Sequence, residues 1–144
     1  MGIDWKNEKD AVSAHFSVRD MIWLPSWGRL ANESDGLDDT IKANLIELAN
    51  KMETVRQLTG NRLIRSHVAY RSPQYNAQIG GAPHSAHRDG RAMDFDVVGL
   101  SCDDARAIIV PALGMLKMRC EDNPGSLWVH LGHDFERQPT YFKP

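Results

Sequence analysis

The chain has 144 residues, which suits one compact domain and is too short for two domains with separate cores. Hydrophobic residues (42%) and charged residues (25%) are balanced as in soluble globular proteins, and the net charge of -2 excludes the basic footprint of a nucleic-acid-binding protein. No apolar run approaches the roughly 20 residues that span a bilayer, so we expect one domain over residues 1–144 without membrane insertion.

Helices are predicted for the first half of the chain. Ser17 to Asp20 has a capping-box-like pattern, which predicts a short helix starting near Ser17. Apolar residues then recur at spacings of three and four between Asp38 and Thr59, and Gly60 stands where a C-cap glycine belongs. The apolar stripe consists of Ile41, Leu45, Leu48, Met52, Val55 and Leu58. This segment is predicted to be the long helix of the scaffold.

Strands are predicted mainly for the second half. Residues 63–70 alternate loosely between apolar and polar, and a short helix follows between Ser-Pro at 72–73 and Gly-Gly at 80–81. Residues 92–98 and 127–131 have the alternation of half-buried strands. Helices followed by strands without regular alternation predict an α+β fold, with a small, mainly antiparallel sheet and flanking helices.

One further helix is predicted between these strands. Ser101 is a suitable cap for a helix over about Cys102 to Met118, which Pro111 should kink or break. Such a helix would hold Cys102 and Cys120 about 27 Å apart, far beyond the reach of a disulfide. We therefore expect both cysteines to be reduced.

Two potential metal ligands, His87 and Asp94, lie seven residues apart in the segment SAHRDGRAMD. On one continuous helix they would be about 10 Å apart along the axis, too far for ligand bonds to one ion. Gly90 lies between them and lets the backbone turn. Asp94, at the start of the next strand, can then lie beside the histidine.

The period of a strand sorts the side chains around these ligands. Asp94 and Asp96 fall on one face, and the apolar residues beside them fall on the other. The same alternation puts Trp128 and His130 on one face of the last strand. With His87, the set is two imidazoles and one carboxylate, which leaves one position open on a tetrahedral zinc, as in catalytic sites. This ligand set favours zinc over magnesium or calcium.

A longer stretch of the sequence resembles the zinc D-alanyl-D-alanine carboxypeptidase family, which includes VanY-type peptidoglycan peptidases and phage endolysins. It reads VAYRSPQYNAQIGGAPHSAHRDGRAMDFDV and is followed by WVHLGH. The family signature Ser-x-His-x-x-Gly-x-Ala-x-Asp is complete from Ser85 to Asp94. The resemblance covers nearly the whole chain. It implies a zinc peptidase catalytic domain with the fold shared by hedgehog signalling domains and these peptidases, and His87, Asp94 and His130 as zinc ligands.

The resemblance also implies roles for residues near the ligands. Arg71 matches an arginine that contacts the substrate and offsets charge on the tetrahedral intermediate, with a surface salt bridge as the alternative. Ser85 matches a position that contacts the substrate backbone. Independently of the resemblance, Trp128 shares the face of His130 and would either wall the substrate cleft or pack in the core. Tyr75 and Gln78, on the short helix after Arg71, are candidates for lining the cleft.

The resemblance leaves the general base unassigned. Relatives often carry Glu or Asp three residues before the last zinc histidine, where this chain has Leu127. Others place an acid farther upstream, so Glu121 is the first candidate and Asp122 the second, on the loop expected before the last strand. His133 could serve if the chain bends at the glycine before it. Asp96 is the remaining candidate, unless it orients a ligand histidine.

Three other histidines receive structural interpretations. His84 lies three residues before His87 and could compete as a ligand, but its place in a Pro-containing loop favours the rim of the site. His15 and His67 lie next to apolar positions of predicted helix or strand and are interpreted as structural.

These observations predict a zinc peptidase that acts on the stem peptides of peptidoglycan. It would either trim a terminal D-alanine or cut between L-alanine and D-glutamate, as a monomer whose partner is the peptide substrate. The polar opening MGIDWKNEKD is unlike a signal peptide. The expected setting is therefore a phage or prophage endolysin, made in the cytoplasm and released to the wall through a phage-encoded pore, or else a cytoplasmic dipeptidase. The alternative function is a zinc-binding module of the same fold without hydrolysis, as in hedgehog proteins, which the missing acid at Leu127 supports.

Overall fold

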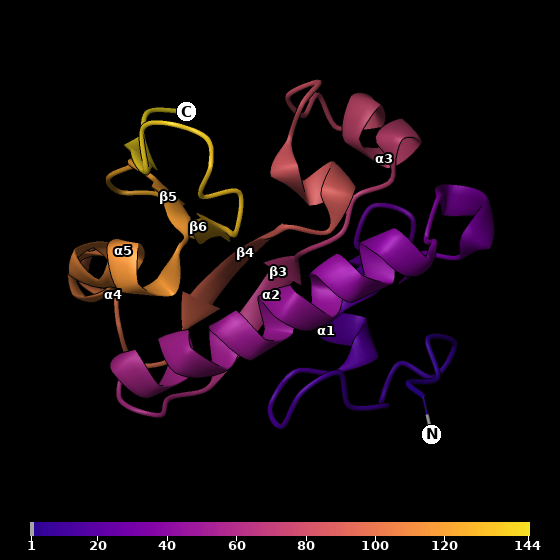
Figure 1. Cartoon of the computed structure of the whole chain (residues 1–144), viewed down its shortest axis with the longest axis horizontal. Coiled ribbons are helices and arrows are strands. Elements are labelled where there is room, and N and C mark those ends of the chain that lie inside the picture. The colour runs from indigo at the N-terminus through magenta and orange to yellow at the C-terminus, as the bar shows by residue number, and fades with distance from the viewer. Residues whose placement is uncertain (1) are drawn as a thin grey trace.

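A five-stranded sheet forms the centre of the computed structural model, which describes residues 2–144 (Figure 1). Its strand order is β3-β4-β6-β5-β7, and every neighbouring pair is antiparallel except β5 and β7. The strands are β3 (Ile64–Val68), β4 (Ala92–Val97), β5 (Arg119–Glu121), β6 (Val129–Gly132) and β7 (Tyr141–Phe142). A separate hairpin joins β1 (Trp23–Leu24) to β2 (Arg29–Leu30). The predicted α+β class and mainly antiparallel sheet are confirmed.

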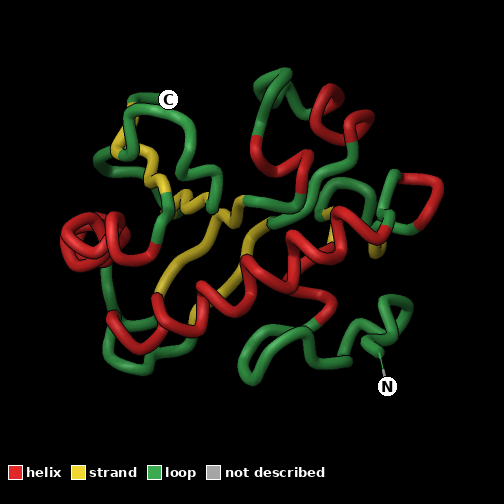
Figure 2. Tube along the Cα trace, in the orientation of Figure 1, coloured by secondary structure: helices red, strands yellow, loops and turns green. Residues whose placement is uncertain are grey.

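Five α-helices and three short 3-10 helices complete the part of the chain that the structure describes. They are α1 (Val18–Ile22), η1 (Glu33–Asp35), α2 (Asp39–Leu58), α3 (Pro73–Gln78), η2 (Ala86–Asp89), α4 (Cys102–Ile109), η3 (Val110–Ala112) and α5 (Leu113–Leu116). Long loops connect α3 to β4 and run through the C-terminal segment after β6 (Figure 2). None of the helices in residues 2–144 has the length and apolar character needed to cross a membrane.

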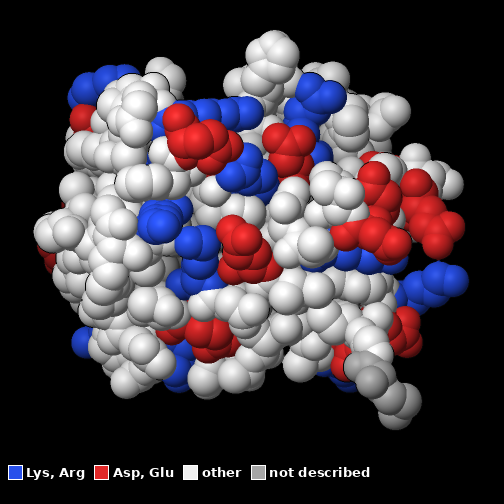
Figure 3. Space-filling model, in the orientation of Figure 1, with Lys and Arg blue, Asp and Glu red and all other residues white. Residues whose placement is uncertain are grey.

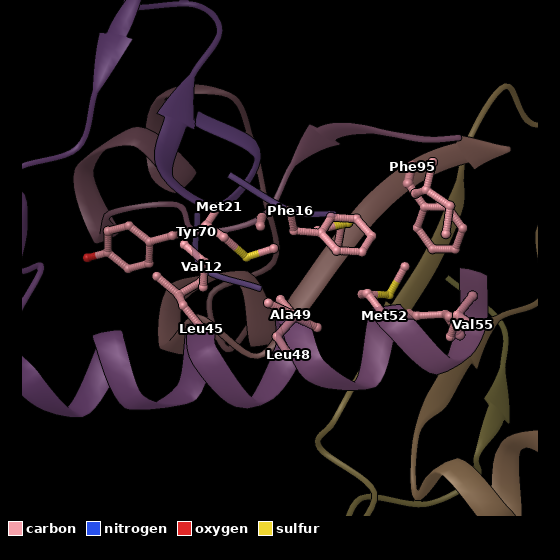
Figure 4. Close-up of a cluster of buried hydrophobic side chains, with 14 of the residues drawn as sticks. Val12, Phe16, Met21, Leu45, Leu48, Ala49, Met52, Val55, Tyr70 and Phe95 are labelled. Atoms are coloured by element: carbon pink, nitrogen blue, oxygen red, sulfur yellow. The ribbon is translucent and has the colours of Figure 1, made fainter. Parts of the chain in front are cut away.

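The long helix α2 forms as the apolar spacing predicted. Asp38 caps it by accepting a hydrogen bond from the Ile41 N–H, and Gly60 follows its end with a φ of +90°. Figure 4 shows the buried side of the helix facing Phe95 of β4 and Phe16. Its fully buried residues are Leu45, Leu48, Ala49, Met52 and Val55. The stripe is narrower than predicted, because Leu58 is exposed and Ile41 is only partly buried.

The alternation in the strands decides which face of the sheet meets α2. Met93, Phe95 and Val97 of β4 are buried in the core, as are Val129 and Leu131 of β6. The residues between them therefore lie on the opposite, polar face of the sheet. This polar face carries the candidate site.

The region after β4 follows the prediction in part. As predicted, the helix expected over 102–118 is interrupted at Pro111, which lies in η3, and α5 ends before Lys117, a residue with a φ of 54°. The chain then enters β5. Glu121 is the last residue of this strand, so the prediction that it lies on a loop is wrong. Cys102 and Cys120 are both free, and burial raises the pKa of the Cys120 thiol to about 12.

Charged side chains are distributed over the surface without segregation by sign on the face that Figure 3 shows. Acidic and basic residues are interspersed there. Across the described residues, charged side chains also form ion pairs, such as Arg91 with Glu136 at 2.7 Å. A pair with both side chains exposed, such as Arg19 with Glu8, contributes little to stability.

Candidate metal centre

Three side chains on the polar face of the sheet form a compact group of metal-ligand type. His87 in η2, Asp94 in β4 and His130 in β6 each offer one ligand atom, and these atoms lie within 4.8 Å of one another. Asp94 Oδ1 is 3.2 Å from His87 Nε2 and 2.9 Å from His130 Nδ1. Asp94 and His130 are direct cross-strand partners in the β4–β6 pair. Two strands and one turn therefore converge on a single point.

The turn between the first two ligands depends on Gly90. Ser85 accepts a hydrogen bond from the His87 N–H at the start of η2, and Gly90 ends the turn with a φ of +69°. A Cβ at Gly90 would also meet Leu45 Cγ at 3.0 Å. Glycine is thus required for both the backbone conformation and the close approach of α2, and it returns Asp94 to His87 as predicted.

The buried ring of His87 is held in the form that binds a cation. Its Nδ1 donates a hydrogen bond to the Ala69 carbonyl at 2.7 Å, and burial lowers the pKa of the ring. The neutral ring therefore has a lone pair, and no proton, at Nε2. This lone pair faces Asp94 Oδ1, an arrangement that a cation between the two atoms would stabilise.

Asp94 is held in its anionic form. Burial opposes ionisation, but the charges and hydrogen bonds of His87 and His130 outweigh it and keep the pKa of Asp94 well below its usual range. Two imidazole nitrogens and one carboxylate oxygen are a donor set that suits zinc and leaves a position open for a reacting molecule. The residues present therefore fit a zinc ion.

Arg71 lies beside the ligands with its side chain 15% exposed, and its ion pair is formed with Asp94 of the ligand group. Its Nη2 donates to Asp94 Oδ2 at 3.2 Å, and its Nη1 donates to Asn76 Oδ1 at 3.4 Å. Its Nε is buried and has no partner in the described residues. Asn76 also donates from Nδ2 to the Ala82 carbonyl at 2.8 Å, so it links Arg71 to the loop before η2.

Gly81 makes this link possible, and its replacement by Ala is expected to destabilise the protein by about 1–3 kcal/mol. An added Cβ would lie 2.1 Å from Asn76 Oδ1, so Asn76 must move and release Arg71 and Ala82. Thermal unfolding measures the loss. Gly114→Ala is the matched control because nothing lies within 4 Å of its Cβ position. Equal melting temperatures for the two variants would contradict the packing argument.

Glu121 lies across from His130 on the neighbouring strand. β5 pairs with β6 at Arg119↔Gly132 and Cys120↔Leu131, and the next pair in this register is Glu121 with His130. Directly opposed residues share a face, so Asp94, His130 and Glu121 form one row across three strands. Glu121 and His130 also line one pocket of about 280 Å³, together with Ser85.

The other candidates for the general base point elsewhere. Asp122 pairs with Lys143 at 2.7 Å and accepts a hydrogen bond from the Tyr141 hydroxyl. His133 lies on the α2 side, where its Nε2 faces the Asn44 carbonyl at 3.0 Å. Asp96 shares the face of Asp94, as predicted, but pairs with Arg65 at 2.7 Å and His67 at 2.6 Å. Asp122, His133 and Asp96 do not line the pocket that contains Glu121.

Two residues predicted to line the cleft are placed elsewhere. Tyr75 is buried, and its ring packs edge-on against Trp27, with 5.1 Å between centroids. Gln78 accepts a hydrogen bond from Trp27 Nε1 at 3.0 Å. Both therefore hold the β1–β2 hairpin against α3. The partner Trp27 is distant in sequence, which is why the local pattern did not reveal this packing.

Trp128 and two of the histidines interpreted from the sequence lie outside the ligand group. Trp128 is 39% exposed, so the structure does not place it in the core, and it lies just before β6 without lining the 280 Å³ pocket. His84 lies on the wall of that pocket and outside the ligand group. His15 pairs with Glu53 at 2.6 Å, away from the site.

Three residues around the site were not identified from the sequence. Asn76 positions Arg71 and stands in the quoted YRSPQYN segment, which was the available signal. Arg119 lines the pocket beside Glu121, and Phe142 packs edge-on against the His130 ring with 5.9 Å between centroids. The last two belong to short strands that have no clear sequence pattern.

Comparison with known proteins gives one family. A family model described as Peptidase M15 matches residues 15–115. No curated protein matches the chain. The matched segment contains His87, Asp94 and Arg71 and ends before Glu121 and His130, which the structure brings to the same site.

Proposed function

The chain belongs to the peptidase M15 family, and from this premise we propose that it is a zinc peptidase that hydrolyses the stem peptides of bacterial peptidoglycan. The family supports a metallopeptidase. The bond would be either the one before a terminal D-alanine or the one between L-alanine and D-glutamate. The observation that carries the proposal is the row Asp94–His130–Glu121. In this row the carboxylate of Glu121, which is not one of the proposed metal ligands, lies beside the ligand group that fits zinc.

In the proposed mechanism, each side chain around the site has a separate role in hydrolysis. A zinc ion held by His87, Asp94 and His130 would supply Lewis-acid chemistry, which activates water and polarises the scissile carbonyl. Glu121 takes a proton from the attacking water and delivers it to the leaving nitrogen. Arg71 faces the ligands with a guanidinium that stabilises the developing oxyanion. Ser85 lines the same pocket as Glu121 and contacts the substrate backbone.

The alternative is a zinc-binding module without hydrolysis. Leu127, at the position where relatives often carry the acid, is 79% exposed and offers no proton acceptor. Glu121 supplies a carboxylate from the neighbouring strand and weighs against this alternative. For the biological setting we propose an endolysin that reaches the wall through a phage-encoded pore. Lysis of cells that express the protein together with a pore-forming holin, and not without it, tests that setting.

The direct test of the function is mass spectrometry of purified peptidoglycan incubated with the protein, with chelator, and with zinc restored. We expect stem-peptide fragments that disappear on chelation and return with zinc, and their masses identify the bond. If a folded, zinc-loaded protein releases no fragment from walls of several peptide types, the peptidase is excluded and the binding module takes its place.

A further inference from the structure

The pocket beside His130 has a cationic wall that the catalytic roles do not use. Its lining includes Arg119 and Arg137, with Asp134 as the carboxylate between them. Asp134 Oδ2 is 3.0 Å from Arg119 Nη1 and 3.6 Å from Arg137 Nη1. With Lys143, the cations that line the pocket outnumber the side-chain carboxylates of Asp134 and Glu121 by three to two. A buried positive charge next to a reaction site is a place where a substrate anion is stabilised.

Arg119 is fixed in an orientation that leaves one nitrogen available. It lies opposite Gly132 in the β5–β6 pair, two residues before Glu121, so its side chain is on the same face as Glu121 and His130. Its Nε donates to the Pro139 carbonyl, Nη1 donates to Asp134, and the guanidinium stacks 4.1 Å from the Phe142 ring centroid. Within residues 2–144, Nη2 has no hydrogen-bond partner, although the residue is only 9% exposed.

The position of Glu121 shows which part of the substrate enters this pocket. The general base must return its proton to the leaving nitrogen, so the substrate residue that carries this nitrogen lies next to Glu121. Glu121 and Arg119 line the same pocket, whose volume of about 280 Å³ suits a small residue. The α-carbon substituents of the leaving residue therefore come within reach of Arg119.

We propose that Arg119 is a specificity-determining residue that binds a carboxylate on the α-carbon of the leaving residue. This inference rests on the proposed function and extends it to the chemistry of the recognised group. Both candidate bonds satisfy it: a terminal D-alanine carries its free carboxylate there, and a D-glutamate linked onward through its γ-carboxyl keeps a free α-carboxylate. The shared feature is the carboxylate, and the two substrates are separated by experiment.

The test compares each substrate with its amide. One pair is an acyl-L-lysyl-D-alanyl-D-alanine and its C-terminal amide, and the other is an L-alanyl-γ-D-glutamyl-L-lysine peptide and its D-isoglutamine counterpart. For the pair that the zinc-loaded protein cleaves, we expect kcat/KM to favour the carboxylate about 10- to 100-fold, the range of a charge-assisted hydrogen bond. Arg119→Met should remove this preference, and Arg119→Lys should keep part of it.

Loss of folding is distinguishable from loss of recognition. A destabilised protein loses activity on carboxylate and amide in the same proportion, so the ratio is unchanged. Arg106→Met is the matched control, because Arg106 is a buried arginine paired with Asp103 outside this pocket and should keep the ratio. Equal cleavage of carboxylate and amide by the unmodified protein, or a preference that survives in Arg119→Met, overturns the inference while the peptidase stands.

A binding measurement decides the inference independently of hydrolysis. Zinc-loaded protein is titrated with D-alanine and with D-alaninamide, and with D-glutamine, which has a free α-carboxylate and an amidated γ-carboxyl, and its α-amide, and NMR shifts are followed. Tighter binding of a carboxylate form by the unmodified protein, lost in Arg119→Met, supports the inference even if no peptide is cleaved and the proposed function fails. Equal binding of both forms overturns it.

Discussion

Replacing Asp94 by Asn is expected to abolish zinc binding and hydrolysis together, with a loss greater than the roughly 10- to 100-fold that follows removal of an outer-shell partner of a metal ligand. Asp94 Oδ1 faces both histidines, and its pKa is held well below the usual range, so it is the one anionic ligand of the group. The amide has almost the same shape but no charge, and it cannot neutralise the cation or the guanidinium of Arg71. Zinc content by elemental analysis and affinity by competition with a chromogenic chelator measure the effect.

Asp96→Asn is the matched control for this experiment. Asp96 lies two residues farther along β4 on the same face, but it is bound to Arg65 and His67 and is not in the ligand group. This variant should retain one zinc ion per chain. If Asp94→Asn binds zinc as tightly as the unmodified protein, or if Asp96→Asn loses the ion equally, the assigned ligand set is wrong.

The parts of the site that could be predicted from the sequence are those where a local pattern determines the geometry. In β4, alternation of apolar and acidic residues allows only one face for Asp94, because Met93 and Phe95 must enter the core. At the end of the η2 turn, position 90 favours glycine, because the backbone has a φ of +69° and a Cβ would meet Leu45. These two local constraints and the same alternation around His130 are compatible with the three proposed ligands, and the resemblance of the longer segment to the zinc peptidase family selected them.

The parts that could not be predicted depend on contacts between distant segments. β5 and β7 are strands of three and two residues, too short for a recognisable period, and they form because β6 and the C-terminal segment supply their partners. The sequence predicts that residues 102–118 form a helix that Pro111 kinks or breaks, and it places Glu121 on the loop that follows. Strand alternation points His133 away from His130 unless the chain bends at Gly132, and the contact with Asn44 of α2 shows that it lies away from the ligand group.

In the proposed peptidase, the placement of β5 between β6 and β7 supplies the candidate general base. Without it, the ligand group alone would be compatible with a zinc-binding module. The strand brings Glu121 into the row of Asp94 and His130 and sets Arg119 two residues away on the same face, so the proposed proton acceptor and the proposed anion site share one rigid element. Groups held on adjacent strands keep a fixed separation, which is what a reaction between them requires.

Glu121→Gln should therefore lower kcat by about 10²- to 10⁴-fold, the range of a lost general base, while zinc binding is unchanged. The amide keeps the size of the side chain and can still occupy the strand end, but it accepts no proton at neutral pH. Steady-state cleavage of the peptide identified from peptidoglycan, together with zinc content and a thermal melt, separates the chemical effect from loss of metal or fold.

Asp122→Asn is the control for the loss of a negative charge at this end of β5. Asp122 is the next residue, its partners are Lys143 and Tyr141, and it does not line the pocket with His130. This variant should keep most of the activity. If Glu121→Gln is as active as the unmodified enzyme, the row of residues across the sheet does not supply the base. If Asp122→Asn carries the large loss, strand β5 presents its other side chain to the substrate, and the register argument for both Glu121 and Arg119 fails.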